Sequence, residues 1–279
     1  MSIRKISFLG RYPFLRITQF YYNPVSLLNW LKKNLYYRWS NKDYSEYYND
    51  FKFLSPNESL CHLIENNCSL ARFNDGEFEQ LLGYGEYPPD SDWEQSNSKE
   101  LIYSMEKVLS SSDGRLLVAI TPNWYFLSDN GAELNEPFCR GMWIHTRAIL
   151  YKYLNKGQAY GDCRMFVPFS SHDFDWNMLR SYLSEKNVII ATGNVEKLSN
   201  VSLGKRNFFV ECGKINAFEK KNSIVKDIIS CMENNKLSKE STIVLASLGP
   251  TAGIIALELL GKVVVWDTGH MFKHAKNEV

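Results

Sequence analysis

The sequence predicts an α/β fold class. We expect a Rossmann-like, doubly wound, mostly parallel sheet with helices on both faces, plus an N-terminal helical appendage. Two observations carry this prediction. Continuous apolar, β-branched runs such as 188–191 and 243–248 are typical of strands that are buried on both faces. Segments of helical period separate these runs, and that alternation favours parallel strands joined by helices.

The expected elements follow in chain order from residue 55. Ser55-Pro56-Asn57-Glu58 is a capping-box sequence and predicts the start of a helix that ends at Asn66-Asn67. Patterns of period 2 or continuous apolar runs predict the strands, and periods of 3.6 predict the helices. Strands are expected at 70–73, 116–121, 165–168, 188–191, 208–210, 243–248 and 263–266, and further helices at 76–82, 101–109, 138–154, 176–183, 224–232 and 251–260.

Bulk properties limit the function. The chain has 279 residues, 44% of them hydrophobic, which suits one large core. A net charge of +1 gives no global electrostatic reason to expect nucleic acid as a partner. The six cysteines form no Cys-x-x-Cys pair, so we expect buried thiols in a reducing compartment. With neither a signal peptide nor an apolar run of membrane length, the expected location is cytoplasmic.

Residues 1–50 are predicted to be a basic, aromatic appendage to a domain at 51–279. Residues 1–42 contain eight Lys or Arg and no Asp or Glu. A helix that begins near Asn23-Pro24 would carry leucines on one side and cations on the other. Such a helix fits the headgroup region of an anionic membrane, which would make the protein peripheral on its inner face. It equally fits a helix that packs on the main domain, and the periodicity does not choose between them.

The segment Ala71-Arg72-Phe73-Asn74-Asp75-Gly76-Glu77 lies where a strand is expected to turn into a helix. Asp75 and Glu77 could hold Mg²⁺ or Mn²⁺, whose remaining ligands would come from a diphosphate. Arg72 could meet phosphate oxygens with its fork of donors. The alternative reading is a plain helix start, because acidic side chains in the first turn favour the macrodipole.

Two later segments also follow expected strands. Leu248-Gly249-Pro250-Thr251-Ala252 starts a helix whose free N–H groups and dipole could bind an anion, or it is an ordinary tight junction. Asp267-Thr268-Gly269-His270 follows the last strand, and His270 could act as a base, a phosphate contact or a structural side chain. Two further candidates could line the same cleft: Asn194, which follows a core strand, and Arg164, at the start of the strand expected at 165–168.

Together and in this order, these motifs resemble the GT-D-fold glycosyltransferases over roughly residues 55–272. The shared features are the Asp75-x-Glu77 segment, Leu248-Gly249-Pro250-Thr251-Ala252 and Asp267-x-Gly269-His270. The chain departs from the family pattern where Asn74 replaces a glycine and Thr268 an apolar residue. Asn tolerates unusual backbone angles better than most residues, so the turn can survive. The match is loosest over 120–210, where acceptor recognition would lie.

The resemblance implies a metal-dependent, nucleotide-sugar-dependent glycosyltransferase of the hexosyltransferase type. It would move a sugar to a glycan or lipid-linked acceptor in surface polysaccharide or glycoconjugate synthesis. It implies Asp75 and Glu77 as metal ligands, with Asp75, Glu77 and His270 as catalytic residues. The substrate-binding residues expected within the shared motifs are Arg72, Asn74, Gly76, Gly249, Pro250, Thr251 and Asp267. Arg164 and Asn194 are expected to bind substrate from their places beside strands, outside the shared motifs. Two rivals stay open: a metal-dependent phosphohydrolase of nucleotide sugars, and a non-catalytic nucleotide-binding adaptor held at membranes by residues 1–42.

Overall fold

The structure, a computed structural model, describes residues 50–81, 95–120, 153–168, 173–198 and 200–274. All of these belong to one compact unit formed by residues 49–122 and 153–279. The N-terminal appendage and the helix expected at 138–154 lie outside the described residues, except for the last two positions of that helix. The domain boundary expected near residue 50 therefore stays a prediction.

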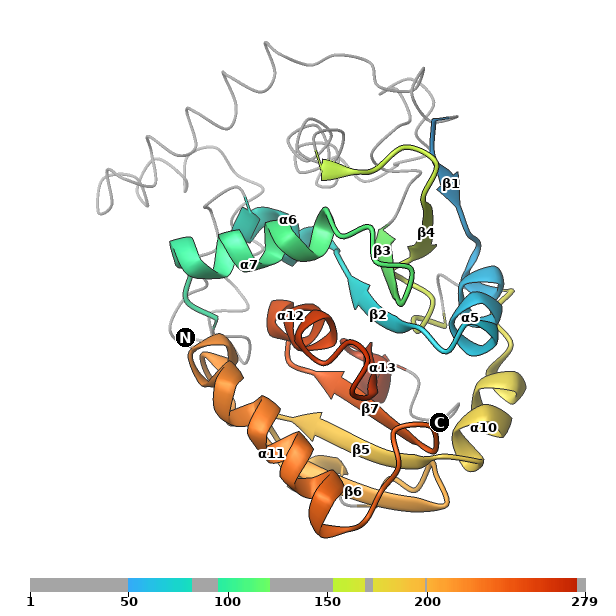
Figure 1. Ribbon diagram of the computed structural model, residues 1–279, viewed down its shortest axis with the longest axis vertical. Helices are drawn as coiled ribbons and strands as arrows, with labels where there is room; N and C mark the ends of the chain where they lie inside the picture. The colour runs from blue at the N-terminus through green and yellow to red at the C-terminus, as the bar shows by residue number, and fades with distance from the viewer. Residues whose placement is uncertain (1–49, 82–94, 121–152, 169–172, 199, 275–279) are drawn as a thin grey trace, which may run out of the picture. The chain divides into compact units, whose positions relative to one another are not determined.

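The unit is built on one eight-stranded sheet in which every pair of neighbouring strands is parallel, which confirms the expected fold class (Figure 1). The strand order is β1-β4-β3-β2-β8-β7-β5-β6. The strands are β1 (Lys52–Phe53), β2 (Ser69–Arg72), β3 (Leu116–Ile120), β4 (Ala159–Asp162), β5 (Asn187–Thr192), β6 (Arg206–Glu211), β7 (Thr242–Ser247) and β8 (Val264–Asp267).

Helices cover both faces of the sheet (Figure 1). On one face lie α5 (Pro56–Glu65) and α10 (Trp176–Ser184). The other face carries α7 (Lys99–Leu109), α11 (Lys221–Asn234) and α12 (Pro250–Glu258). The short helices are α6 (Asp75–Leu81), η3 (Glu196–Leu198), η4 (Ala217–Lys220) and α13 (Met271–His274). In this part of the chain no helix is both long and apolar enough to cross a membrane.

The core on the α5 and α10 face is centred on Trp266 of β8, which is fully buried. Its indole Nε1 donates to the carbonyl of Cys68 at 2.9 Å, and the Tyr182 ring stacks on it with centroids 5.4 Å apart. A buried indole N–H needs such a partner, so this bond lets the largest side chain of the core enter a central strand.

Helix α12 packs on the opposite face against β2, β8 and α7. Its residues 251–256 are all buried, as expected for a helix that is apolar on every side. A Cβ added at Gly253 would lie 3.1 Å from the Cβ of Ala71 in β2. Two small residues therefore let this helix approach the strand that ends in the acidic motif.

Some local predictions are wrong. Residues 165–168 form turns, while the strand in that region is β4, which ends at Asp162. In its sequence, Ala159-Tyr160-Gly161-Asp162, only the tyrosine favours a strand, while alanine, glycine and aspartate are depleted from strands, so the propensity signal is weak. Tertiary packing decides the outcome. Tyr160 is fully buried, and a Cβ on Gly161 would lie 2.9 Å from a Leu117 methyl.

Five of the six cysteines lie in the described part, and all five are free thiols. Cys68, Cys163 and Cys212 are buried, whereas Cys61 and Cys231 are half-buried. Burial raises the pKa of the Cys212 thiol to about 12, so it stays protonated at neutral pH. The expectation of buried thiols holds for three of these five positions.

The first testable prediction concerns the capping box of α5. Ser55 Oγ accepts the Glu58 N–H at 3.3 Å, and Glu58 Oε2 accepts the Ser55 N–H at 2.8 Å. We expect Ser55→Ala to lower the free energy of unfolding by about 1 kcal/mol, because an N–H of the first turn loses its acceptor. Urea unfolding measures this. Glu58→Gln should change it by less than about 0.5 kcal/mol, since Gln also completes the box; equal losses would contradict the assignment.

Candidate active site

All motifs singled out in the sequence lie at the carboxyl edge of the parallel sheet, where ligands of open α/β sheets bind. The direction of the connections reverses between the neighbouring strands β7 and β5. The connection after β7 leads to β8 on one side, and the connection after β5 leads to β6 on the other. Gly249 follows β7 and Asn194 follows β5, so these two residues flank the reversal.

Arg72 at the end of β2 is held by Asp267 at the end of β8. Asp267 Oδ2 accepts the Arg72 backbone N–H at 3.2 Å, and Asp267 Oδ1 lies 3.5 Å from Arg72 Nε. The Asp267 carboxyl is fully buried; burial raises its pKa, while the Arg72 charge and N–H groups of Arg72 and Gly269 oppose that shift. The structure thus makes Asp267 a partner of Arg72. Its predicted contact with substrate stays a prediction.

Gly269 makes room for the Arg72 guanidinium. Its φ is +48°, a value that favours glycine, and its N–H donates to Asp267 Oδ1 at 3.0 Å. A Cβ at this position would coincide with Arg72 Nη2, so no other residue could stand here without moving the arginine. Arg72 Nη1 donates to the carbonyl of Cys163 at 2.7 Å. The guanidinium of β2 is therefore held by two segments that are far apart in the sequence, residues 267–269 and Cys163.

The turn after β4 brings Asp162 and Arg164 to this edge. Asp162 Oδ1 accepts the Arg164 N–H at 2.7 Å. Burial raises the pKa of Asp162, and the positive charges of Arg164 and Arg72 lower it. Sequence reasoning missed Asp162 because it placed the strand six residues too late, and it wrongly placed Arg164 at the start of that strand. The signal that could have found Asp162 is an acidic residue right after the small, buried Gly161.

The acidic motif begins α6, with Asn74 as the residue before its first turn. Asp75 is the first helical residue and Gly76 the second, but the Asp75 side chain lies outside the described part. Glu77 Oε2 accepts the Asn74 N–H at 3.0 Å, and the Asn74 carbonyl accepts the Phe78 N–H at 3.1 Å. Glu77 therefore caps α6, as in a capping box. This observation supports the interpretation of the motif as a helix start. It does not test the prediction that Asp75 and Glu77 bind a metal.

The Gly249-Pro250-Thr251 segment starts α12 with open donors. Gly249 has φ +57° and ψ −142°, a region reached almost only by glycine, and a Cβ there would meet no described atom within 4 Å. Pro250 has no N–H, and no hydrogen bond within the described part uses the N–H of Gly249 or Thr251. The Thr251 side chain, by contrast, is fully buried. The backbone of this turn thus suits an anion.

The segment after β8 is tied to the end of β7. Ser247 Oγ donates to the Gly269 carbonyl at 2.8 Å and lies 3.0 Å from Thr268 Oγ1. Thr268 Oγ1 also donates to the Ala246 carbonyl at 3.2 Å, which gives the buried hydroxyl a partner. His270 follows directly, half-buried, and its carbonyl accepts the Lys273 N–H in α13.

The predicted residues do not all converge. Arg72, Asp267 and Gly269 are in contact, and β7 lies two strand spacings from β2, about 10 Å. Asn194 is one spacing farther, at about 14 Å from β2. Its Oδ1 accepts the Lys197 N–H at 3.3 Å, so its side chain caps η3. It shares the edge with the others, on the far side of the reversal.

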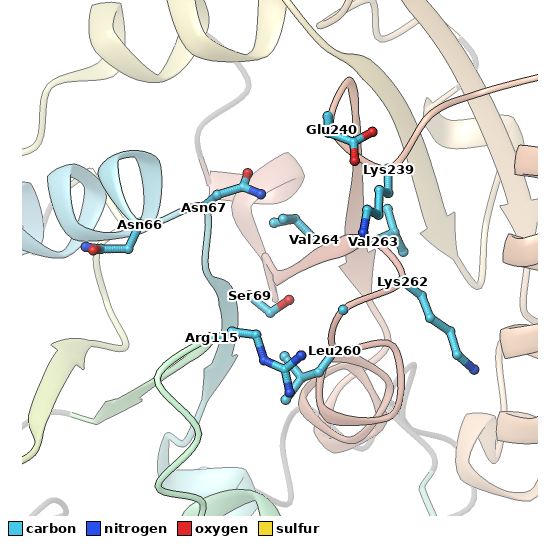
Figure 2. Close-up of a pocket in the computed structure, with 11 residues that line it drawn as sticks. Asn66, Asn67, Ser69, Arg115, Lys239, Glu240, Leu260, Lys262, Val263 and Val264 are labelled. Carbon is cyan, nitrogen blue, oxygen red and sulfur yellow. The ribbon is translucent and has the colours of Figure 1, made fainter.

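A pocket of about 280 Å³ lies at the opposite, amino edge of the sheet (Figure 2). Ser69 and Val264 begin their strands there, and three cationic side chains line it: Arg115, Lys239 and Lys262. Helices α5 and α12 both end beside it, at Asn66 and Leu259. Helix C-termini carry partial negative charge, which these cations offset. The pocket thus lies at the opposite edge of the sheet from the motifs.

Comparison with known families decides the class of this arrangement. The family model described as Glycosyltransferase GT-D fold matches residues 70–276. This chain belongs to the Glycosyltransferase GT-D fold family. The matched part of the GT-D chain contains every predicted site residue, from Arg72 to His270. The resemblance expected from the three motifs is confirmed.

Individual relatives of the GT-D chain agree with this. Glycosyltransferase GlyD of Streptococcus pneumoniae serotype 4 (strain ATCC BAA-334 / TIGR4) is 24% identical over 226 residues, which cover 77% of this chain and 26% of GlyD. The GT-D chain therefore matches only about a quarter of that relative.

Two solved structures share the fold of the GT-D chain. One, described as the highly conserved domain of unknown function 1792 with a distinct glycosyltransferase fold, has a TM-score of 0.62, 22% identity and 83% coverage of each chain. The other, described as a new glycosyltransferase (DUF1792) from Streptococcus sanguinis, has a TM-score of 0.57 and 23% identity, and the match covers 81% of this chain and 84% of that one. At these identities the likeness establishes the fold.

The second testable prediction is that Arg72 and Asp267 are energetically coupled. We expect Arg72→Met or Asp267→Asn alone to lower the free energy of unfolding by about 3 kcal/mol, because each leaves a buried charge without its partner. The double variant should lose less than the sum, with a coupling energy of about 1–3 kcal/mol in urea unfolding.

The matched control for this cycle is Lys205 with Glu185, whose charged atoms lie 2.8 Å apart on two exposed side chains. The cycle Lys205→Met with Glu185→Gln should give less than about 0.5 kcal/mol, since exposed ion pairs contribute little. A coupling at Arg72 and Asp267 no larger than this control would contradict a structural pairing of these residues.

Proposed function

We propose that this GT-D chain is a metal-dependent glycosyltransferase that moves a sugar from a nucleotide diphosphate sugar to a glycan or lipid-linked acceptor. The pathway it would serve is surface polysaccharide or glycoconjugate synthesis, on the cytoplasmic side of a membrane. The observation that carries the proposal is that the three family motifs share the carboxyl edge of one sheet, beside the reversal of strand order. A diphosphate placed there has both an acidic motif and a helix start within reach.

The donor set of the acidic motif fits a divalent cation. Two carboxylates at positions 75 and 77, at the first turn of one helix, supply hard oxygen ligands and leave further positions for phosphate and water. In the described part no three His, Cys, Asp or Glu side chains are grouped to hold a metal by themselves. In this proposal the substrate's phosphate oxygens complete the ligand set. When bound, Mg²⁺ or Mn²⁺ would neutralise charge on the diphosphate leaving group.

The chain's own residues supply the remaining electrostatics. The free N–H groups of Gly249 and Thr251, at the positive end of the α12 dipole, are donors for phosphate oxygens. Arg72, with 14% of its side chain exposed, adds a fixed positive charge at the same edge. Such preorganised donors stabilise the negative charge that develops as the sugar leaves. His270 and Glu77 are the two candidates for a general base if the anomeric centre inverts.

Donor screening tests the proposal directly. Full-length protein is incubated with Mn²⁺ and candidate nucleotide sugars, with and without glycan acceptors, and products are identified by mass spectrometry. A glycosyltransferase gives mostly sugar–acceptor conjugate. Free sugar that is independent of acceptor would instead indicate a phosphohydrolase. Tight nucleotide binding with no turnover in an exhaustive screen would indicate an adaptor.

The third testable prediction separates the capping role of Glu77 from its catalytic role. Asp75→Ala and Glu77→Ala should lose nearly all transfer while they remain folded, with rates reduced by about 10²–10³ or more. Glu77→Gln should lose transfer as well, since a neutral amide is a poorer cation ligand. It should keep its stability, because Gln still accepts the Asn74 N–H, whereas Glu77→Ala should lose about 1 kcal/mol.

Glu58→Gln is the control for this comparison, since it makes the same change in the capping box of α5. Its transfer rate should equal that of the wild type. Full metal-dependent turnover by Asp75→Ala or Glu77→Gln would overturn the assignment of the acidic motif.

The fourth testable prediction concerns residues 1–42, whose eight cations are not balanced by any acid. If they bind an anionic membrane surface, deletion of residues 1–42 should abolish sedimentation of the protein with phosphatidylglycerol vesicles, and salt should weaken sedimentation of the full chain. Neutral phosphatidylcholine vesicles are the control. Equal sedimentation of the two proteins would contradict membrane binding through residues 1–42. It would instead favour a segment that packs on the domain.

A further inference from the structure

Gln95 lies at the centre of a buried polar network that joins the two helices carrying the site motifs. Its side chain is only 7% exposed. Its backbone carbonyl accepts Gln80 Nε2 of α6 at 3.2 Å. Its Oε1 lies 3.5 Å from the Thr251 hydroxyl of α12 and accepts the Phe218 N–H of η4 at 3.0 Å. One residue outside every motif therefore contacts α6, α12 and η4.

Within the described part, the Thr251 hydroxyl has one hydrogen-bond partner, Gln95 Oε1, at the long end of hydrogen-bond distance. The side chain is fully buried, so it does not face the open side of the Gly249 turn. Helix α12 also lacks a capping side chain, because its N-cap is a glycine. Its first turn therefore depends on lateral contacts, and the contact between Thr251 and Gln95 is one of them.

On the α6 side the network continues through Gln80 and Asn97. Asn97 Nδ2 donates to the Gln80 carbonyl at 3.0 Å. The side-chain oxygens of Gln80 and Asn97 are buried and make no hydrogen bond among the described residues. The network therefore links α6, through Gln80, to the segment that contains Gln95 and Asn97.

We propose that Gln95 is a positioning residue that fixes the first turn of α12 relative to α6. The inference rests on the proposed function and names a determinant of the same site. Strands β2 and β7, which lead into α6 and α12, are separated by β8. Helix α12 packs on β2 at Gly253, beyond its first turn, whereas the Gln95 contact is made at the first turn itself. Gln95 spans that separation. It sets the distance between the acidic motif and the open N–H groups of Gly249 and Thr251. In the proposed function, the acidic motif holds one end of a diphosphate through the cation, and the N–H groups hold the other end.

The test uses full-length protein and four probes: UDP, GDP, CDP and ADP, each with Mn²⁺. Gln95→Met keeps the side-chain length and removes the acceptor, and Thr251→Val keeps the shape and removes the hydroxyl. For the probe that wild type binds best, we expect each variant to raise the dissociation constant three- to tenfold. The double variant should be no weaker than the weaker single variant, because both changes break one link.

Two controls separate positioning from general stability. Ile228→Val trims a fully buried side chain of α11, and Thr242→Val removes a buried hydroxyl that has no partner in the described part. Both should leave the dissociation constant within twofold of wild type, even where Ile228→Val lowers the melting temperature as much as Gln95→Met does. Weakened binding in these controls, or additive losses in the double variant, would overturn the inference.

Hydrogen exchange of the unliganded protein tests the link without any ligand. Gln95→Met should speed exchange in α6 and in the first turn of α12 together, and leave α10 unchanged. Unchanged exchange in α6 and α12 would overturn the inference. If exchange speeds up while wild type binds none of the four probes, the link between the helices is supported and the proposed function is overturned.

Discussion

The ion pair between Arg72 and Asp267 is the constraint on which the carboxyl edge depends. A fully buried carboxylate costs free energy unless a charge and several donors face it, and here it receives the N–H groups of Arg72 and Gly269 in addition to the guanidinium. Because Gly269 has no side chain, the arginine can lie against the backbone that follows β8. The ends of β2 and β8 are thereby held in one arrangement, and with them the starts of α6 and α13.

This constraint also holds the three motifs of the chain near one another. Asp75 follows Arg72 by three residues, and His270 follows Asp267 by three residues. These two catalytic candidates are therefore each one short turn from a member of the pair. The third motif, residues 248–252, is tied to the segment after β8 through the preceding residue, Ser247, whose hydroxyl donates to the Gly269 carbonyl. Asn74 stands where the family pattern has glycine. Its φ is not positive, so this turn does not require glycine at position 74.

Much of the fold could be predicted from the sequence because its strands are buried on both faces. Runs such as those of β5 and β7 leave few alternatives, and the capping box at Ser55 marks the α5 start directly. Strand β4 could not be predicted, since Tyr160 and Gly161 owe their strand conformation to partners in β3 and α5. The site was predictable to the extent that short motifs follow strong strands. Gln95 was not, because a lone glutamine in a polar stretch has no periodic signal, and only the packed structure shows it buried.

The place of β8 in the strand order has a consequence for how the protein is made. The last strand of the described part, β8, lies in the middle of the sheet, between β2 and β7. On a ribosome, β2, β3 and β4 can pair early, and β5, β6 and β7 can pair later, but the two groups stay separate until residue 267 has left the exit tunnel. Until then the nascent chain exposes two apolar strand edges, a condition that favours chaperone binding and slow final closure.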